Sequence, residues 1–487
     1  MSASRIVLSA VFAAAAFAAV LWITRPPGPG LDPDTMSYLG AARSFAESGR
    51  FRIPAGGWES PDPTSALSHF PPGFSFVLAG PVALGAAPIG AARVVEALAA
   101  AATAALVTWL AASGTGLLGG ALAGVFLFVT PALATDHARV LSEPLFLALS
   151  VLVLLLMVRS PDRPLGYGIV AAFASMVRYA GVALSGAAAL WALARPGTLR
   201  RRLVGAALAL APTVLLQGAW TVRTHAESAN LRSFGLKGGL GPTLAEGWQT
   251  LTTWLAPGVA PPLLVTAIAL LVVVLGAAAL GRALPRERPL LSAAGLVAVC
   301  YAGVVVFSRL FADEAIPLDD RLLSPLILFV SLGVAVAAAS VWSASRTARR
   351  WAGACVMVAW LAASAWRTGV SVADAREGGW GYASTGWRDS DLVRWLRTEG
   401  AGYALFSNNP ADVWFATGRP SWNLPETADS DSVAAFGAVL RQRHGLVIGF
   451  ESPLEEMARP EELSGLLALP IIARLDGAAV WGPASPP

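Results

Sequence analysis

The sequence predicts an α-helical polytopic membrane protein with a small α/β domain at its C-terminal end. Hydrophobic residues make up 55% of its 487 residues and charged residues only 14%, against roughly 25% charged residues in an average soluble domain. The mean hydropathy is +0.60. Apolar stretches long enough to cross about 30 Å of hydrocarbon recur through residues 1–371, whereas residues 372–487 have an ordinary mixed composition. We therefore expect a transmembrane domain over 1–371 and a separate domain over 372–487.

The apolar segments predict about eleven transmembrane helices. They are 6–24, 90–112, 117–135, 143–158, 165–178, 180–194, 203–222, 261–281, 290–309, 322–343 and 351–371. The segments 165–178 and 180–194 are short for a full crossing, and the apolar residues 71–87 are expected in the outer interface. The first segment also has the basic start of a signal peptide, but residues 22–24 make a poor cleavage site.

The arginines between these segments predict the orientation, because basic residues gather in cytoplasmic loops. With a cytoplasmic N-terminus, every short loop rich in arginine falls inside the cell. The long loop 25–89, with its interfacial helices, and the tail from 372 then lie outside the inner (plasma) membrane. The formal charge of +4 is spread over short loops, so it indicates topology and no nucleic-acid partner. Cys300 and Cys355 lie in apolar segments and indicate neither a disulfide framework nor a zinc site.

The outer side of this topology collects most of the unusual polar residues. They are Asp32, Asp34, His69, Asp136, His137, Glu143, Arg178, His225, Asp319, Asp320 and Arg321. Ionisable groups at a bilayer boundary are costly unless they face water, a partner or a ligand, so the clustering predicts a functional site. Each residue also has a structural explanation. Asp34 is well placed to cap a helix that stops at Gly49, and Asp320 and Arg321 are able to pair locally at a helix start.

Five short motifs occur in a fixed order along these loops. They are Asp34 followed by Tyr38-Leu39 and an Ala-rich helix, His69-Phe70-Pro71-Pro72-Gly73, Arg139 with Ser142-Glu143-Pro144, Arg178-Tyr179, and Asp320-Arg321-Leu322-Leu323-Ser324-Pro325. The ordered set covers most of residues 1–343. It resembles the polytopic glycosyltransferases of the C superfamily (GT-C), especially the bacterial branch with the lipid A aminoarabinose transferase and the protein O-mannosyltransferases.

The resemblance implies an integral membrane glycosyltransferase. Its donor is a sugar on a polyprenyl phosphate held in the membrane lipid, and its acceptor is a glycan, lipid or protein on the outer side. By similarity, the catalytic residues are Asp34, which is the base or orients the acceptor, and Glu143, which matches the acid of the second outer loop. Arg178 and Arg321 stabilise the phosphate. In-line displacement would invert the anomeric centre.

The resemblance also implies further substrate-binding residues. These are Asp32, which completes an Asp-x-Asp, and Tyr38, His69, Asp136, His137, Tyr179 and Asp320. Use of a divalent cation stays open, because carboxylates such as Asp34 and Glu143 serve Mg²⁺, Mn²⁺ and general bases alike. The sequence does not indicate which sugar or acceptor is used.

Two other classes of protein remain as alternatives. A transporter or flippase for a lipid-linked or amphiphilic substrate would also need polar groups in an apolar body, but it would carry them near mid-span and show related halves. A non-catalytic scaffold would use the outer domain to bind a partner. Substitution of Asp34 by Ala that leaves the cellular glycans unchanged would favour either alternative.

The tail alternates helical and extended patterns. We expect helices over 389–398, 410–416 and 430–442, and strands over 403–407, 446–450, 471–475 and 478–481. No phosphate loop, metal cluster or nucleophile motif is found in it. Asn408, Asn409, Asp412, Trp414 and Trp422 are candidates for contact with a sugar acceptor, although Trp in a small domain more often belongs to the core.

Overall fold

The computed structural model describes residues 3–227, 235–255, 288–344, 347–451, 457–475 and 477–482. Contacts divide the chain into two compact units. The first unit contains Met1–Ile23 and Arg93–Asp374, and the second contains Thr24–Ala92 and Ala375–Pro487. The predicted boundary at residue 372 lies close to Ala375. Residues 24–92, which hydropathy placed with the membrane domain, group with the tail.

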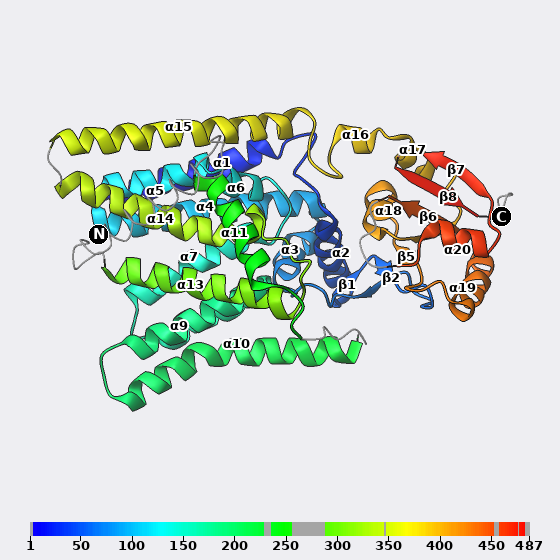
Figure 1. Ribbon diagram of the computed structural model, residues 1–487, viewed down its shortest axis with the longest axis horizontal. Helices are drawn as coiled ribbons and strands as arrows, with labels where there is room; N and C mark the ends of the chain where they lie inside the picture. The colour runs from blue at the N-terminus through cyan, green and yellow to red at the C-terminus, as the bar shows by residue number, and fades with distance from the viewer. Residues whose placement is uncertain are drawn as a thin grey trace. The chain divides into compact units, whose positions relative to one another are not determined.

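The first unit is a bundle of helices that run side by side (Figure 1). The helices are α1 (Ala3–Ile23), α4 (Pro88–Thr115), α5 (Leu117–Val129), α6 (Pro131–Asp136), α7 (Glu143–Arg159), α8 (Pro164–Val177), α9 (Val182–Ala194), α10 (Leu199–Glu227), α11 (Leu240–Leu255), α13 (Arg288–Phe311), α14 (Asp320–Ala344) and α15 (Thr347–Glu377), with a 3-10 turn η1 at Tyr179–Gly181. Helix α10 packs on α8 and α9, α13 packs on α9, and α14 packs on α5. The amphipathic helix α11 was not predicted.

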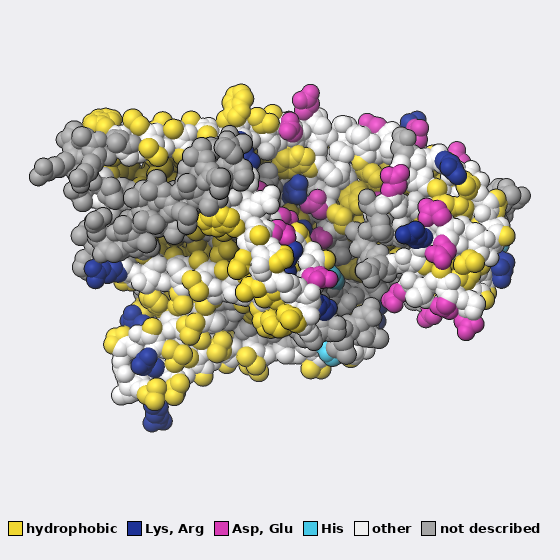
Figure 2. Space-filling view, in the orientation of Figure 1, with side chains coloured by type: hydrophobic (Ala, Val, Ile, Leu, Met, Phe, Trp, Pro, Cys, Tyr) yellow, Lys and Arg dark blue, Asp and Glu magenta, His cyan; other side chains and the backbone are white. Residues whose placement is uncertain are grey.

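The helices identify a multi-pass membrane protein. Among the described residues, six helices are long and apolar enough to cross a membrane, namely α1, α4, α10, α13, α14 and α15, and shorter apolar helices include α5, α8 and α9. Large apolar side chains on α10 and α15 stay exposed, such as Leu215 at 71% and Trp366 at 76%, and Figure 2 shows apolar atoms over both helices. Such faces suit lipid contact. The predicted span 261–281 lies outside the described residues.

One predicted span is divided in the structure. The segment 117–135 forms two helices, α5 and α6, which meet at Thr130. Pro131 has no backbone N–H with which to continue the ladder of α5. The Thr130 hydroxyl instead donates to the Phe126 carbonyl at 2.6 Å. The break turns α6 so that it ends at Asp136, just before the loop that leads to α7.

The second unit combines the long loop that follows α1 with the tail. From the loop come α2 (Pro33–Ser48), β1 (Arg52–Ile53), β2 (Ala55–Gly56), β3 (Ser65–Ala66) and α3 (Gly73–Ala83). From the tail come α16 (Thr385–Arg388), α17 (Asp391–Arg397), β4 (Ala404–Ser407), α18 (Pro410–Thr417), β5 (Ser421–Asn423), α19 (Ser430–Gln442), β6 (Gly445–Phe450), α20 (Pro460–Leu466), β7 (Ile471–Leu475) and β8 (Ala478–Trp481). The expected α/β character of the tail is confirmed, and β5 and α20 are additional.

A six-stranded sheet in the order β2-β5-β4-β6-β8-β7 organises this unit. The strands β2, β5, β4 and β6 are parallel, and β8 is antiparallel to β6 and β7. Both faces are covered, which explains why every residue of β6 is buried. Leu405 and Ile448 pack with α17 and α18 on one face, whereas Phe406 and Val447 pack with α19 and α20 on the other.

The predicted cap of α2 is wrong by two residues. Asp32 is the N-cap, and its backbone N–H donates to the Thr35 hydroxyl at 3.0 Å. Asp34 lies inside the first turn. The reason is Pro33, whose fixed φ and missing N–H suit the first helical position, so the cap must be the residue before it. The helix ends at Gly49 as expected.

The tail fixes the chain just before α2. Leu31 forms an isolated parallel bridge with Gly381. The Leu31 carbonyl accepts from the N–H of Tyr382 at 3.0 Å. Gly381 has φ +57°, and a Cβ atom there would lie 2.1 Å from the Leu31 carbonyl oxygen. The bridge therefore requires glycine at 381. The bridge fixes the backbone of Leu31, which directly precedes Asp32.

Candidate active site

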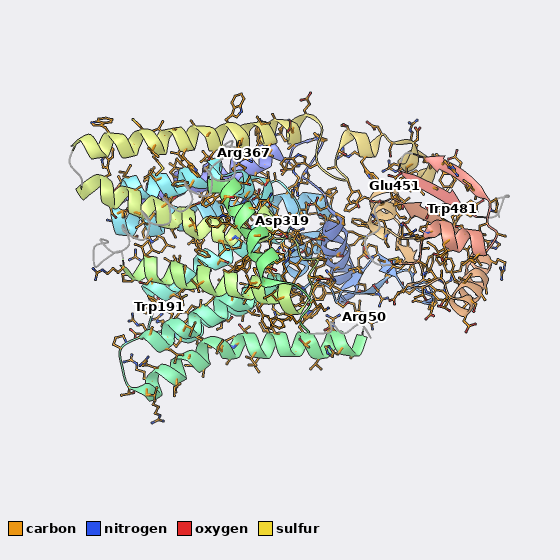
Figure 3. All side chains as sticks on the ribbon, viewed as in Figure 1. Arg50, Trp191, Asp319, Arg367, Glu451 and Trp481 are labelled. Atoms are coloured by element: carbon orange, nitrogen blue, oxygen red, sulfur yellow. The ribbon has the colours of Figure 1, made fainter. Side chains whose placement is uncertain are left out.

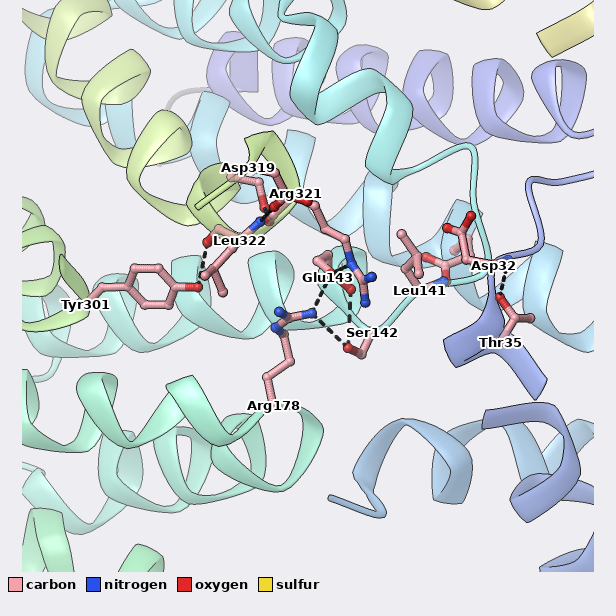
Figure 4. Close-up of polar contacts among 12 residues, drawn as sticks. Asp32, Thr35, Leu141, Ser142, Glu143, Arg178, Tyr301, Asp319, Arg321 and Leu322 are labelled. Atoms are coloured by element: carbon pink, nitrogen blue, oxygen red, sulfur yellow. Dashed lines mark hydrogen bonds and ion pairs between the residues drawn. The ribbon is translucent and has the colours of Figure 1, made fainter. Parts of the chain in front are cut away.

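Two arginines converge on one buried carboxylate in the first unit. The Glu143 side chain is 1% exposed and forms ion pairs with Arg178 and Arg321. The Arg178 Nη1 to Glu143 Oε1 distance is 2.5 Å, and Arg178 also donates to the Ser142 hydroxyl at 3.2 Å. Figure 4 shows the two guanidinium groups approaching Glu143 from opposite sides. The sequence predicted all three residues as site residues, and the structure brings them together.

Local structure explains how each charge reaches this point. Glu143 is the first residue of α7, where Pro144 suits the first turn. Arg178 follows α8 in an extended conformation, between that helix and η1. Arg321 lies in the first turn of α14, two residues after Asp319, whose carboxylate accepts from the Leu322 N–H at 2.8 Å (Figure 4). Asp319 thus caps α14, while Arg321 pairs with Glu143.

The exposed fractions of the three side chains show which of them is nearest the surface. Glu143 is 1% exposed, Arg178 15% and Arg321 27%. The carboxylate therefore lies beneath the arginines, and an incoming anion meets guanidinium groups first. Guanidinium forks match phosphate oxygens in geometry and charge. Breaking a buried pair of this kind typically costs about 3–5 kcal/mol, because a charge is left without compensation.

Further polar groups of the first unit lie near Glu143 and its two arginines. Asp136 is 3% exposed and lies close enough to Glu143, Arg178 and Arg321 for their charges to interact. The His137 ring contacts the Leu133 carbonyl oxygen through Nδ1 at 2.6 Å, which fixes the ring against its own helix. Asp136 therefore joins the charge cluster, whereas the contact of His137 is local and structural.

The other predicted residues of this unit have different contacts. The Tyr179 hydroxyl accepts from Trp220 Nε1 at 3.1 Å, and the Arg223 guanidinium lies 5.0 Å from the centre of the Trp220 ring. Asp320 is exposed in the first turn of α14 and lines a separate cavity with Arg367. His225 is at the end of α10. These residues lie outside the contacts that join Glu143 to its two arginines.

Sequence reasoning missed Glu96 and Tyr301. Glu96 lies in α4, is 1% exposed, and accepts from the Leu141 N–H at 3.2 Å through Oε1. It therefore supports the loop that leads into Glu143. The Tyr301 hydroxyl donates to the Leu322 carbonyl at 2.9 Å (Figure 4), and so holds the chain next to Arg321. Glu96 is an acidic residue inside the apolar segment 90–112, and this unusual position could have identified it from the sequence.

In the second unit, the predicted residues of the first loop lie on and after α2. Asp32 and Asp34 are half-buried at the start of α2. Tyr38 is 2% exposed, with its ring 4.9 Å from that of Phe70 and 5.1 Å from that of Phe74. The exposed His69 lies edge-on to Phe70 at 4.7 Å. Tyr38 thus belongs to an aromatic core that fixes the α2 helix against α3.

The candidate acceptor residues of the tail serve the fold. The Asn408 amide bonds the backbone of Phe450 in both directions, at 2.8 and 2.9 Å. The Asn409 carbonyl oxygen caps α18 by accepting from the Asp412 N–H at 3.3 Å. Trp422 stacks on Phe406 at 5.2 Å. Trp414 is half-buried beside Phe415.

Asp412 gives the second unit a pH dependence. Burial raises the pKa of Asp412 from its ordinary 3.8 to about 6, although a hydrogen bond from Tyr382 lowers it in part. The folded state therefore binds this proton more tightly than the unfolded state. The contribution of Asp412 to stability is therefore expected to be full below about pH 4 and to fall as pH rises toward 6, by on the order of 2–3 kcal/mol.

We expect Asp412→Asn to raise the melting temperature at pH 7.5 and to have little effect at pH 4.5. Asn keeps an acceptor for Tyr382 and removes the buried charge. Thermal unfolding of the full chain in detergent at the two pH values measures this, with the exposed Asp391→Asn as control. A lower melting temperature for Asp412→Asn at pH 7.5 contradicts the assignment.

The donor set of Glu143 does not fit a divalent cation. Its carboxylate is already engaged by two guanidinium groups, which occupy the positions that a cation would need and repel it. Among the residues that the structure describes, no group of three or more His, Cys, Asp or Glu side chains is placed to hold a metal ion.

These features together define a polytopic membrane protein with a charge cluster at the ends of α7, α8 and α14. Solved structures match it over nearly its whole length. ArnT from Cupriavidus metallidurans bound to undecaprenyl phosphate has 16% identity, 97% coverage of each chain and a TM-score of 0.58. Its apo state has 15% identity, the same coverage and a TM-score of 0.59.

An archaeal protein matches less completely. The oligosaccharyltransferase AglB from Archaeoglobus fulgidus, in complex with an inhibitory peptide and a dolichol-phosphate, has 11% identity and a TM-score of 0.55. The match covers 91% of this chain and 69% of that one. No family model and no curated protein match the sequence. At such identities the similarity shows the fold, and the predicted GT-C fold is confirmed.

Proposed function

We propose that this protein is a membrane glycosyltransferase that moves a sugar from a polyprenyl-phosphate donor to an acceptor on the outer side of the inner membrane. The observation that carries the proposal is the buried Glu143 between Arg178 and Arg321, at one end of the helical bundle. ArnT has been solved with undecaprenyl phosphate and AglB with a dolichol-phosphate. A polyprenyl phosphate is therefore the donor class that the fold and the arginines both favour.

The two arginines stabilise the leaving group in this reaction. The acceptor oxygen attacks the anomeric carbon, the bond from that carbon to the phosphate oxygen breaks, and the electron pair leaves with the polyprenyl phosphate. Negative charge therefore grows on the phosphate in the transition state. Arg178 and Arg321 are held in place before the reaction, so they stabilise this charge without reorganising. Displacement in line inverts the anomeric centre.

Glu143 acts as a positioning residue in this proposal. A carboxylate that two guanidinium groups engage is a weak proton acceptor. Its two ion pairs fix the guanidinium groups of α8 and α14 near each other, which they would otherwise resist as like charges. The proton of the acceptor hydroxyl needs another base, and we assign this role to Asp34 in the first turn of α2.

The test is transfer of radiolabelled sugar from a panel of polyprenyl-phosphate sugars by the purified protein. We expect the wild type to transfer one of them and Asp34→Asn to lose at least about a hundred-fold in rate, as for loss of a general base. Asp62→Asn is the matched control, because Asp62 is an exposed acid of the same loop that pairs with Arg52. Parallel reactions with EDTA decide whether a divalent cation is used.

The outcomes separate the three classes of protein. If Asp34→Asn abolishes the transfer and Asp62→Asn retains it, the protein is a glycosyltransferase, and the sugar that is transferred identifies its donor. Transfer that survives in Asp34→Asn contradicts the base assignment only. Binding of a donor by the wild type without transfer of its sugar contradicts the glycosyltransferase and favours a transporter or a scaffold.

A further inference from the structure

The first unit contains a second polar site, at the opposite end of α8 from Arg178. A cavity of about 210 Å³ lies between α8, α9 and α10. Its polar lining consists of Tyr167, Asp162, Arg195, Arg201 and Arg202. Figure 2 shows basic side chains gathered at this end, where α9 passes to α10. The predicted topology places these arginines on the cytoplasmic side.

Two buried polar atoms in this lining lack a partner among the described residues. The Tyr167 side chain is 0% exposed, and its hydroxyl has no hydrogen-bond partner there. The Nε atom of Arg195 is likewise buried and without a partner. Buried polar groups are nearly always hydrogen-bonded, so a donor pair beside a cavity indicates an acceptor that occupies the cavity.

The charges of the lining favour an anion. Three arginines face one carboxylate, Asp162. The Arg201 to Asp162 ion pair, at 3.2 Å, joins side chains that are 71% and 70% exposed, so water and salt screen it and leave it weak. Arg202 is fixed by a hydrogen bond from its Nε to the Leu193 carbonyl at the end of α9. The excess of guanidinium groups suits phosphate oxygens.

The apolar lining indicates that the anion carries an acyl chain. Val204 and Leu208 line the same cavity from α10 and are 51% and 40% exposed. Helix α8 has 14 residues and so spans only about 21 Å, less than the roughly 30 Å of the hydrocarbon core. A short helix draws the lipid headgroups toward its end. The cavity therefore lies where a lipid phosphate and the first part of its chain meet.

Close packing keeps the cavity in shape. A Cβ atom at Gly168 of α8 would lie 2.6 Å from the carbonyl oxygen of Ala209, so α8 and α10 touch directly beside the cavity that Tyr167 and Leu208 line. The indole N–H of Trp191, labelled in Figure 3, donates to the Met157 carbonyl at 2.9 Å and joins α9 to the end of α7.

We propose that this cavity binds one anionic phospholipid from the cytoplasmic leaflet. Arg195, Arg201 and Arg202 bind the phosphate, the Tyr167 hydroxyl donates to one of its oxygens, and an acyl chain follows Val204 and Leu208. The site is distinct from the proposed donor site, and it stands whether or not the protein is a glycosyltransferase. It lies on the helix that carries Arg178 at its other end.

Native mass spectrometry of the purified full chain tests the proposal with phosphatidylglycerol and phosphatidylcholine. We expect the wild type to retain one phosphatidylglycerol and to discriminate at least about tenfold against phosphatidylcholine, as for a charge-assisted hydrogen-bonded site. Arg201→Ala combined with Arg202→Ala removes this preference. Tyr167→Phe weakens retention about fivefold by loss of one hydrogen bond. Arg200→Ala is the matched control, because Arg200 precedes these arginines on α10 and does not line the cavity.

Specific results would overturn the proposal. Equal retention of the two lipids by the wild type excludes an anion-selective site. A loss in Arg200→Ala as large as that in the double variant indicates general attraction to a basic surface. Displacement of phosphatidylglycerol by inorganic phosphate at millimolar concentration assigns the cavity to a free anion. Melting temperatures establish which variants are folded. If the double variant is unfolded, the retention of phosphatidylglycerol by Tyr167→Phe decides whether the proposal holds.

Discussion

Replacement of Glu143 by Gln is expected to reduce the rate of sugar transfer at least about a hundred-fold. Gln keeps the size of the side chain but removes the charge that holds Arg178 and Arg321 together. The two guanidinium groups then repel each other and move from the leaving phosphate, and loss of one preorganised charge stabiliser typically costs 10²- to 10³-fold in rate. We expect the loss in kcat more than in KM, because the charge develops in the transition state.

The control for this variant is Glu246→Gln. Glu246 of α11 also pairs with an arginine, Arg309, at 2.6 Å, but its side chain is 41% exposed, and its contacts hold α11 to the loop before α14. We expect a small loss of stability and little loss of kcat. Equal loss of kcat in the two variants would indicate a general effect of removing an acid that pairs with an arginine.

A double variant distinguishes positioning from direct catalysis. If Glu143 acts by holding Arg321, then Glu143→Gln combined with Arg321→Ala should be hardly slower than Arg321→Ala alone. A product of the two single effects would instead show that Glu143 acts independently of Arg321, through its ion pair with Arg178 or by proton transfer. Melting temperatures of the single variants exclude the case in which the chain is unfolded.

Much of the helical fold could be predicted because a membrane protein carries long periodic signals. The segment 143–158 became α7, and the tail patterns at 430–442, 471–475 and 478–481 match α19, β7 and β8. What could not be predicted is non-local. The two-residue strand β2 has no periodicity of its own and exists because it pairs with β5, far along the chain.

The candidate site was predicted in part for the same reason. Charges at a membrane boundary are costly, so Glu143, Arg178 and Arg321 could be selected from sequence. Their mutual pairing depends on how α7, α8 and α14 pack, which hydropathy does not encode. Tyr38 was selected by resemblance, and its burial between Phe70 and Phe74 depends on the packing of α3.

The largest expected effect in the second unit is that of Gly381→Ala. The new Cβ atom would lie 2.1 Å from the Leu31 carbonyl oxygen, and the residue has φ +57°. The left-handed conformation alone costs an alanine about 1–2 kcal/mol, and the clash must also be relieved by opening the bridge. We expect a loss of stability of about 3 kcal/mol or more, within the range of strained sites.

Opening the bridge should also affect transfer, because Leu31 directly precedes the cap of α2. Asp34 is carried by the first turn of that helix, and a shift of about 1 Å in a catalytic group is able to cost on the order of a hundred-fold in rate. The matched control is Gly418→Ala, since Gly418 has φ +72° but nothing within 4 Å of a Cβ atom. Gly418→Ala therefore has the energetic cost of the left-handed backbone conformation but no steric clash. If both variants lose equal stability and equal transfer rate, the contact between residues 31 and 381 does not position the base, and the tail stabilises the unit only as a whole.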